Sequence, residues 1–406
     1  MSQIAVRHRN ATRIFHAVRS TPGATQREIV EMSEADKSTV STVLREFEKL
    51  GLIERVERRH SGGRGRPSEG YAISSAGGLV VGVNLRPKEI RLVLADLAGE
   101  PRAVLSRPMA ENVNDIGRSI HAGIVGLMIS AGLEEATLRA VGITVPGLVQ
   151  TDGTVRHSPN LDWSNFNPKM QLMSETEVPV FIGNNADGAA LGEILLKNPP
   201  SDRSFMLVLC DSGVGAGLVY NGELCRGDGG FAGEIGHQKI MRGGRNCICG
   251  SHGCLDAHVS NRSMMAIVCE AGIEVDEFAD IVRLVEAGDP RMTGIMKDYI
   301  DAMAMGLANS VSVTGLPDVV LSGGMAAMYP HIERQLHEAL KDLIHPQLLV
   351  DLRFTVGMEE NRERPLGGVA IALEGCTGFA ALEHAPWAPP QQREPLNSLA
   401  TSGETL

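Results

Sequence analysis

Three cysteines and a histidine lie close together near the middle of this 406-residue chain, and they constrain the local fold more strictly than any other feature. Cys247, Cys249 and Cys254 fall within eight positions, and His237 lies ten residues before the first of them. Three thiolates and one imidazole form the ligand set of a closed tetrahedral zinc site, with His252 as an alternative fourth ligand. Four protein ligands leave no open position for a reacting water, so we expect a structural Zn²⁺ in the loop 237–254.

The remaining composition fits a modular globular protein. The chain is long enough for two or three folded units, and its seven cysteines, an odd number, fit a reducing compartment better than a disulfide framework. No apolar stretch is long enough to cross a bilayer, and the polar start lacks the apolar core of a signal peptide. We therefore expect a cytoplasmic protein with no membrane partner.

Charge is distributed unevenly along the chain. The formal net charge is −11, but residues 1–70 hold 13 of the 38 Lys and Arg residues and only 9 of the 49 Asp and Glu residues. A basic head thus precedes an acidic body. This asymmetry is typical of a DNA-binding module attached to a small-molecule domain, because the head attracts phosphates and the body discourages non-specific binding.

The basic head carries the pattern of three helices. A short apolar stripe at Ile14, Phe15 and Val18 ends at the turn 21–23. Thr25 and Glu28 have the spacing of a capping box, so a second helix starts at Gln26. Asp36 can cap a third helix, which Gly51 ends. The expected buried positions of the second and third helices are Ile29, Val30, Met32, Val40, Val43, Leu44, Phe47 and Leu50.

The opposite face of the third helix is rich in hydroxyl groups and bases. Short hydroxyls can bond phosphates or base edges, and an arginine can read guanine. We interpret this face as a recognition surface for the major groove, with a small all-helical bundle as the alternative. Its expected DNA-binding residues are Lys37, Ser38, Thr39, Ser41, Thr42 and Arg45.

A β-wing is predicted after the helices. Residues 52–56 and 70–73 read as two strands, and the intervening tip 61–67 carries Arg64 and Arg66 between glycines, closed by a proline. Such arginines suit the narrow minor groove of A·T-rich DNA, where the negative potential is deepest. The alternative interpretation is an interdomain linker with solubilising arginines. The order of the two signals favours a winged helix-turn-helix.

From Gly77 onward, apolar strands alternate with helical stretches, as in an α/β protein. Residues 78–84 and 90–96 read as a hairpin. Four further strands are expected at 138–146, 178–183, 205–210 and 319–324. Each ends in a loop rich in Gly, Asn or Asp, where α/β folds place their ligands.

The motifs of this body together resemble the ROK family of repressors, open reading frames and sugar kinases. The resemblance spans about residues 77–383 and rests on the zinc loop with 233–237, on 146–149, 158–161, 184 with 189–193, 212–217 and 322–324. It implies the two-lobed actin/hexokinase-like (ribonuclease H-like) fold. With a winged helix in front, the chain is similar to the repressor branch, which includes the xylose and N-acetylglucosamine repressors.

The resemblance also exposes two losses on the catalytic side. The family's sugar kinases use an Asp as the base that takes the sugar hydroxyl's proton, whereas the aligned residue here is Asn185, an amide. Asp187 is a candidate replacement, although a following helix would turn it elsewhere. The segment 84–88 lacks the Asp and the glycines of the first phosphate loop, and the glycine-rich loop 211–217 is weak evidence for ATP by itself. We therefore expect no kinase activity.

The sugar pocket is better preserved. By resemblance, Asn160, Asn184, Glu234 and His237 occupy sugar-binding positions, and Asn185 can bond the hydroxyl that its Asp counterpart would deprotonate. For Glu234 and Asn160, a purely structural role is the alternative. Asp256 replaces the glutamate that usually follows the last zinc cysteine and is one methylene shorter. The shorter acid is expected to enlarge the pocket or to change the preferred sugar.

These observations give one overall hypothesis. Residues 1–75 form a winged helix-turn-helix, 76–384 a sugar-binding ROK domain, and 385–406 a disordered tail. The chain acts as a repressor of carbohydrate genes, as a homodimer or homotetramer on a double-stranded DNA operator, controlled by a sugar or sugar-phosphate effector. The alternatives are an active ATP-dependent sugar kinase with a DNA-binding head, and a DNA-binding protein whose body serves only as a dimerisation scaffold.

Overall fold

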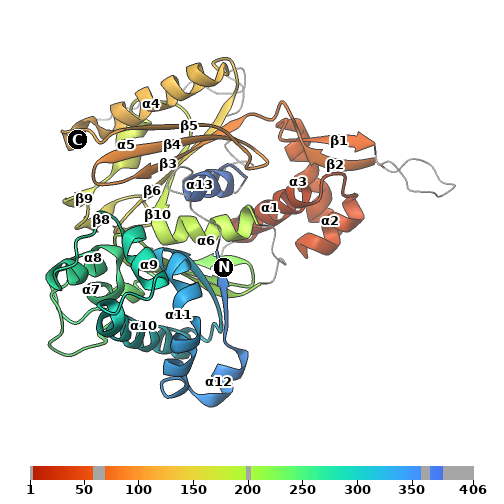
Figure 1. Cartoon of the computed structure of the whole chain (residues 1–406). Helices are drawn as coiled ribbons and strands as arrows, with labels where there is room; N and C mark the ends of the chain where they lie inside the picture. Colours follow the sequence, from red (N-terminus) through yellow and green to blue (C-terminus); the bar gives the residue numbers. More distant parts are fainter. Residues whose placement is uncertain (1–2, 58–68, 198–202, 358–365, 378–406) are drawn as a thin grey trace, which may run out of the picture. The chain divides into compact units, whose positions relative to one another are not determined.

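The computed structural model describes the chain except residues 1–2, 58–68, 198–202, 358–365 and 378–406 (Figure 1). It divides into two compact units: an N-terminal unit built mainly from residues 1–77, and a C-terminal unit built from 78–176 and 180–374. Each unit is described by itself. Among the described helices, none has the length and apolar character that a membrane span requires.

The N-terminal unit is a winged helix, as the sequence predicts. Three helices are followed by an antiparallel two-stranded sheet in which Ile53 pairs with Ile73. The elements are α1 (Gln3–Ser20), α2 (Gln26–Ser33), α3 (Lys37–Lys49), β1 (Ile53–Glu57) and β2 (Glu69–Ile73).

Local side-chain chemistry fixes the helix starts. Thr25 and Glu28 form the expected capping box on α2, and the carboxylate of Asp36 accepts hydrogen bonds from the backbone N–H groups of Ser38 and Thr39 at the start of α3. The core between the helices contains an edge-to-face pair of Phe15 and Phe47, with ring centroids 5.7 Å apart. Of the three apolar residues expected in the core from α2, Ile29 is fully buried, whereas Val30 and Met32 are only half-buried.

The first sheet of the C-terminal unit has the strand order β10-β6-β3-β4-β5 (Figure 1). The expected hairpin is present as the antiparallel pair β3 and β4, and β3, β6 and β10 run parallel. The added edge strand β5 was not predicted. Its burial alternates along the strand, so it lacks the continuous apolar run of its neighbours. The strands are β3 (Leu79–Leu85), β4 (Glu89–Asp96), β5 (Pro101–Pro108), β6 (Leu138–Val145) and β10 (Val180–Asn184).

Helices cover both faces of the first sheet. Helix α4 packs on β4 and β5. Helix α13 approaches β3 and β6 so closely that a Cβ atom at Gly82 or Gly142 would overlap its backbone. The further elements here are the 3₁₀ helix η1 (Val113–Asp115), α4 (Ile116–Ala131), α5 (Pro168–Met173), α13 (Leu366–Thr377) and a small sheet of β7 (Leu148–Val149), β8 (Val155–Ser158) and β9 (Trp163–Phe166).

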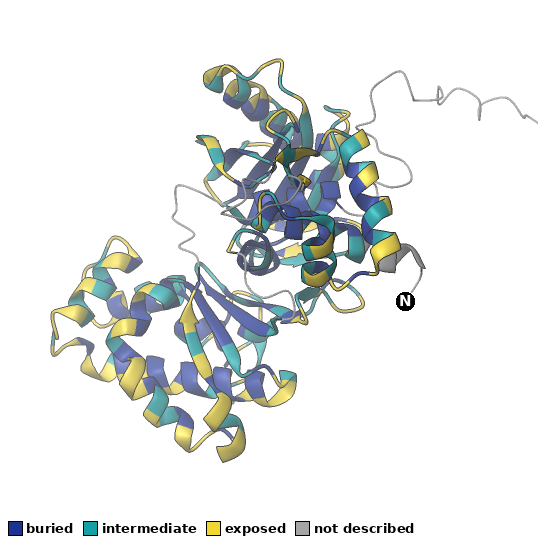
Figure 2. Ribbon diagram, turned by 90° about the vertical axis from the view of Figure 1, so that its right-hand side faces the viewer, coloured by how far each residue is buried: buried dark blue, intermediate teal, exposed yellow. Residues whose placement is uncertain are grey.

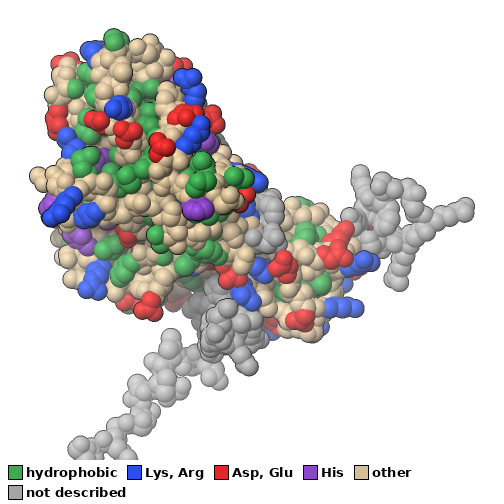
Figure 3. Space-filling model, turned by 90° about the horizontal axis from the view of Figure 1, so that it is seen from below, with side chains coloured by type: hydrophobic (Ala, Val, Ile, Leu, Met, Phe, Trp, Pro, Cys, Tyr) green, Lys and Arg blue, Asp and Glu red, His purple; other side chains and the backbone are tan. Residues whose placement is uncertain are grey.

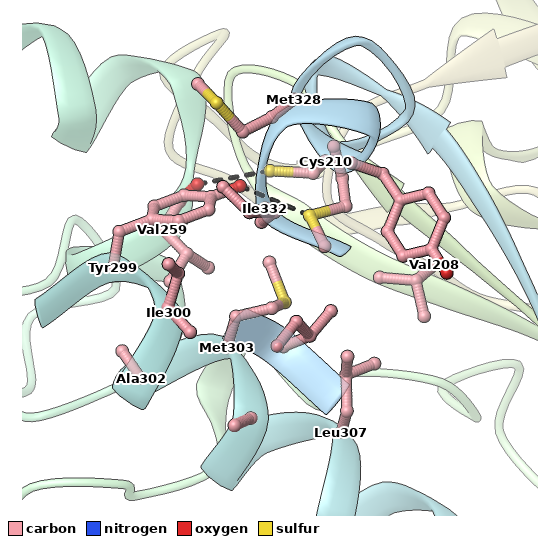
Figure 4. Packing of buried hydrophobic residues seen from close by; sticks show 14 of the residues in the cluster. Val208, Cys210, Val259, Tyr299, Ile300, Ala302, Met303, Leu307, Met328 and Ile332 are labelled. Carbon is pink, nitrogen blue, oxygen red and sulfur yellow. Dashed lines mark hydrogen bonds between the residues drawn. The ribbon is translucent and has the colours of Figure 1, made fainter. Parts of the chain in front are cut away.

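The second sheet has the order β13-β12-β11-β14-β15, and a layer of helices packs on it. Tyr299 is among the largest fully buried side chains in the core between this sheet and the helices. The hydroxyl of Tyr299 donates a hydrogen bond to the sulfur of Met325 (Figure 4). The elements are β11 (Phe205–Cys210), β12 (Val214–Tyr220), β13 (Glu223–Cys225), β14 (Asp318–Gly323), β15 (Arg353–Val356), the 3₁₀ helix η2 (Ile235–His237), α7 (Asp256–Val259), α8 (Asn261–Glu270), α9 (Phe278–Glu286), α10 (Met292–Thr314), α11 (Gly324–Lys341) and α12 (Pro346–Asp351).

Helix α6 (Asn185–Leu195) contacts strands of both sheets. Nine of its 11 residues are buried, and so are all six residues of β11, which it contacts (buried residues are dark blue in Figure 2). Its small residues allow this close packing: a Cβ atom at Gly217 of β12 would lie only 2.4 Å from Cβ of Ala190 and 2.8 Å from the carbonyl oxygen of Ala186. The fold therefore fixes the position of this helix more tightly than that of any surface helix.

Gly217→Ala should destabilise the protein by about 1–3 kcal/mol, because α6 is enclosed and cannot move away from an added methyl group. Denaturant unfolding would measure this loss. Gly126→Ala on α4 is the matched control, since no atom lies within 4 Å of its added Cβ and alanine favours a helix. Equal stability of the two variants would contradict the packing described for α6.

Candidate functional site

A pocket in the C-terminal unit lies beside the start of α6 and between loops of the two sheets. The lining includes Pro146 and Gly147 after β6, and the loop 211–214 that joins β11 to β12. The structure brings all six residues expected to bind an effector into this lining: Asn160, Asn184, Asn185, Glu234, His237 and Asp256. These residues come from segments separated by almost 100 positions, and the fold places them in one cavity.

The start of α6 presents amides to the pocket. Asn184 caps the helix by accepting a hydrogen bond from the backbone N–H of Asp187 (2.7 Å). Asn185 is the first helical residue, and its side-chain oxygen accepts a hydrogen bond from Nδ2 of Asn84 (3.3 Å). Both amides are thus held in place, and neither can accept a proton from a sugar hydroxyl.

Asp187 does not replace the missing base in this arrangement. The helix places its carboxyl group in the interior, 6% exposed, and it is not part of the pocket lining. Burial raises the pKa of Asp187 to about 7, opposed by the positive charge of Arg226. Arg226 in turn donates a hydrogen bond to Glu374 (2.5 Å). Asp187 therefore lies in the interior near an ion pair whose own side chains are 39% and 21% exposed.

Arg86 contacts residues of two segments, 84–88 and 211–217, that the resemblance aligns with the phosphate loops of the kinases. Nε of Arg86 donates to the side-chain oxygen of Asn84 (2.8 Å), and its Nη2 lies 3.7 Å from Oδ2 of Asp211. Asn84 also donates to Thr144 (2.9 Å). A guanidinium group therefore lies between the segment 84–88 and the loop 211–217, the two places where the resemblance implies nucleotide phosphates in the kinases.

Glu234 and His237 form one wall of the pocket. Glu234 immediately precedes η2, and His237 is its last residue. The turn before Glu234 needs Gly233, which has φ +84° and leaves no room for a Cβ atom beside the carbonyl oxygen of Ala216. Burial raises the pKa of Glu234 to about 7, and the negative charges of Asp187 and Asp256 add to the shift. Nε2 of His237 lies 3.9 Å from the Glu234 carboxylate.

Asp256 lines the pocket, but both of its oxygens are already engaged. Oδ2 accepts a hydrogen bond from the backbone N–H of Val214 (2.9 Å), and Oδ1 accepts one from Nη2 of Arg262 (2.7 Å). Nη1 of the same arginine donates to Oδ1 of Asn160 (2.9 Å). The shorter acid thus meets an arginine that also lines the pocket.

The expected metal ligands meet beside this wall. The ligand atoms of His237, Cys247, Cys249 and Cys254 all lie within 4.8 Å of one another. Sγ of Cys247 is 3.7 Å from Nδ1 of His237, and Sγ of Cys249 is 3.9 Å from Sγ of Cys254. A tetrahedral ion with bonds of about 2.3 Å to sulfur separates its ligands by roughly 3.8 Å. The four residues fit a tetrahedral metal ion.

The surroundings of the cluster fit the same role. Lys239 donates a hydrogen bond to Sγ of Cys254 (2.8 Å), so a positive charge lies beside the thiols. The alternative ligand, His252, is not part of the cluster, because it lies opposite Asn246 in an isolated β-bridge. His237 directs Nδ1 toward the cysteines and Nε2 toward Glu234. One imidazole ring thus connects the metal cluster with the pocket.

In the N-terminal unit, α3 carries the six residues expected to contact DNA. Lys37, Ser38, Thr42 and Arg45 are exposed, while Thr39 and Ser41 are half-exposed. The hydroxyls of Ser38 and Thr39 donate to the capping carboxylate of Asp36, and that of Thr42 donates to the carbonyl oxygen of Ser38. These hydroxyls therefore serve the helix start in the protein alone. The six residues are Lys37, Ser38, Thr39, Ser41, Thr42 and Arg45.

The tip of the wing lies outside the described residues, and with it Arg64 and Arg66. At the base of the wing, Arg55 donates to Glu48 of α3 (2.6 Å) and to Glu69 of β2 (2.9 Å). These exposed ion pairs link the wing to the helix expected to enter the major groove.

Three polar residues of these sites were missed in the sequence: Arg86, Lys239 and Arg262. Each is a single basic residue without a motif, and its role follows only from partners distant in the chain. For Arg262, the available signal was its position six residues after Asp256, which puts the two residues in consecutive helices, α7 and α8.

Comparisons with known proteins agree with both units. Residues 80–374 match the ROK family, and residues 8–66 match the MarR family. A putative xylose repressor from Caldicellulosiruptor sp. (strain Rt8B.4) is 29% identical over 374 residues, which cover 86% of this chain and 92% of that protein. The DNA-binding transcriptional dual regulator NagC of Escherichia coli (strain K12) is 22% identical over 393 residues, or 93% of this chain and 96% of NagC.

A solved structure shows the same fold over nearly the whole chain. The crystal structure of a ROK family transcriptional regulator, a homolog of the E. coli MLC protein, has a TM-score of 0.79 at 21% sequence identity. The match covers 94% of this chain and 99% of that one. The family match extends over well more than half of the sequence, and the chain therefore belongs to the ROK family.

Proposed function

We propose that this protein is a DNA-binding repressor of sugar-metabolism genes whose ROK domain binds a sugar effector without phosphorylating it. The observation that carries the proposal is the pocket itself: six polar residues converge there, while the position of the kinase base holds the amide of Asn185. The similarity to repressors along both units supports DNA binding in the same chain.

The site supports binding more than catalysis. Amide, carboxyl and imidazole groups can hold sugar hydroxyls, but phosphoryl transfer also needs a base and a place for the nucleotide phosphates. Asp187 is buried and is not part of the pocket lining, and the segment 84–88 lacks the Asp and the glycines that the resemblance implies for the first phosphate loop of the kinases. A sugar kinase with a DNA-binding head remains the second candidate, because the chain shares the kinases' family.

The metal in this proposal is a structural Zn²⁺ held by His237, Cys247, Cys249 and Cys254. When bound, it neutralises thiolate charge and ties the loop 237–254 together. The loop ends two residues before Asp256, and its first ligand also faces Glu234. The metal would thereby keep two walls of the pocket in a fixed arrangement.

DNA contact is assigned to the N-terminal unit, with two copies of the chain on a palindromic operator. On the face of the molecule drawn in Figure 3, acidic and basic side chains lie close to one another. Sugar binding would then change operator affinity by favouring one arrangement of the dimer over another.

The first test concerns the metal. Purified protein should contain about one zinc ion per chain, and Cys249→Ser should lose it, because three ligands no longer close the tetrahedron. Elemental analysis measures the metal, and the melting temperature should fall with it. Cys269→Ser is the control, since that exposed cysteine lies outside the cluster. Zinc retained at full occupancy in Cys249→Ser would refute this ligand set.

The second test concerns the recognition helix. Arg45→Ala should weaken operator binding by about tenfold or more. If the arginine contacts a phosphate, the substitution should also reduce the salt dependence of operator binding. A gel-shift titration at several salt concentrations distinguishes the two contacts. Arg102→Ala serves as the control, because Arg102 is exposed on the C-terminal unit and pairs with Asp96. Unchanged affinity for Arg45→Ala would remove this face of α3 from the DNA contact.

The third test separates sensor from kinase. A cognate sugar at about 100 times its Kd should stabilise the protein by about 2.7 kcal/mol and shift operator affinity, with no ADP formed in the presence of ATP. Glu234→Gln should weaken sugar binding by about tenfold, whereas exposed Glu135→Gln should not. Phosphorylation of any sugar would establish the kinase, and Asp187→Asn would then show whether that carboxylate is its base.

A further inference from the structure

Arg262 holds two pocket residues that belong to different parts of the C-terminal unit. Asn160 follows β8 beside the first sheet, and Asp256 begins α7 beside the second. The guanidinium group donates from Nη1 to Asn160 and from Nη2 to Asp256, at 2.9 and 2.7 Å. Its side chain remains 34% exposed, while that of Asp256 is 3% exposed. The arginine is thus the accessible member of this group of three.

Arg262 is positioned by the start of α8. Ser260 caps this helix and is fully buried: its hydroxyl accepts a hydrogen bond from the backbone N–H of Ser263 and donates one to the hydroxyl of Ser263. The next backbone N–H, that of Asn261, donates to the carbonyl oxygen of Asp211 in the pocket loop (2.8 Å). The helix that carries the arginine is therefore attached directly to the pocket.

The contacts of Arg262 determine which hydrogen bonds this wall can offer. A guanidinium group only donates, so the amide oxygen of Asn160 must face it and the NH₂ group is left for other partners. That nitrogen lies 4.0 Å from the Cβ position of Gly213, a residue of the pocket loop. Both oxygens of Asp256 already accept hydrogen bonds. The side of this wall formed by Asn160 and Arg262 therefore presents N–H donors.

The charges lining the pocket add a second selection. Three carboxylates, those of Asp211, Glu234 and Asp256, line it together with the single guanidinium group of Arg262. The positive charge of Arg262 is balanced by Asp256 at 2.7 Å. The charge of Asp211 is likewise opposed by Arg86, whose Nη2 lies 3.7 Å from Oδ2 of Asp211. Glu234 has no arginine partner among the described residues, so a phosphate placed beside it would meet the negative charge that Glu234 carries when ionised. A neutral sugar would not.

We propose that Arg262 is a specificity-determining residue of the effector pocket. Because of Arg262, the pocket selects a neutral sugar that presents an acceptor oxygen to the wall of Asn160 and Arg262. The inference rests on the proposed function, because it assigns the ligand class of the same pocket. Arg262 acts by direct contact with the ligand and by fixing the orientation of the Asn160 amide.

The test compares dissociation constants by calorimetry for D-xylose, D-glucose, N-acetyl-D-glucosamine and the 6-phosphates of the last two. In the unaltered protein, the tightest ligand should be a neutral sugar. Arg262→Met should change the ratio of the dissociation constants of the neutral sugars by about tenfold, because Asn160 becomes free to accept. Arg262→Lys, which keeps a donor, should restore part of the original ratio.

Two further variants keep the test decisive. Arg262→Met removes the positive charge that neutralises the buried carboxylate of Asp256. The double variant Asp256→Asn with Arg262→Met removes that negative charge as well, and it should show the same changed ratio of dissociation constants for the neutral sugars. Arg283→Met, at an exposed ion pair on α9, should leave all ratios unchanged. Zinc content and melting temperature report folding in each variant.

Three results would overturn the inference. A sugar phosphate as the tightest ligand would refute the neutral class. Neutral-sugar ratios unchanged in both Arg262 variants would refute the role of Arg262 while leaving the sensor function intact. Failure of the unaltered protein to bind any of the five sugars, by contrast, would refute the proposed function first and this inference with it.

Discussion

Helix α6 is enclosed between two sheets, and this packing constrains every other part of the C-terminal unit. Its alanines and glycines allow β12 to approach within van der Waals contact at Gly217, and Gly188 of the helix lies equally close to Thr144 of β6. A helix held on both sides cannot rotate or slide without opening a core. Its first turn therefore presents Asn184 and Asn185 in a fixed position, and the pocket is assembled around that turn.

The same turn determines which polar side chains reach the pocket. One helical step brings Asn185 to the pocket, and two further residues place Asp187 in the interior beside Arg226 and Glu374. The carboxylate is thus close in sequence but unavailable in space. Arg86 lies between the segment 84–88 and the loop 211–217, where it contacts Asn84 and Asp211.

Local chemistry was predictable from the sequence to a large extent. The capping box of Thr25 and Glu28 and the cap at Asp36 depend on residues a few positions apart, where spacing decides which atoms can meet. The convergence of His237 with three cysteines was predicted from the ligand chemistry of zinc. The six pocket residues were identified through resemblance to a family, and the structure brings them together.

Contacts between distant segments were not predictable in the same way. Asp256 was read as a shortened sugar ligand, whereas its environment depends on Arg262 and on the backbone of Val214. A sequence pattern shows which residue is replaced, but the compensating partner comes from packing.

The ring of His237 has a consequence for how such a site can vary. Its two nitrogens face different neighbours, the thiol of Cys247 on one side and the carboxylate of Glu234 on the other. A fourth cysteine would hold a zinc ion equally well, yet a thiolate offers a single atom and would leave Glu234 without its neighbour. A cysteine at position 237 would therefore keep the metal site but remove a contact of Glu234 at the pocket. One side chain thus meets the requirements of two neighbouring sites.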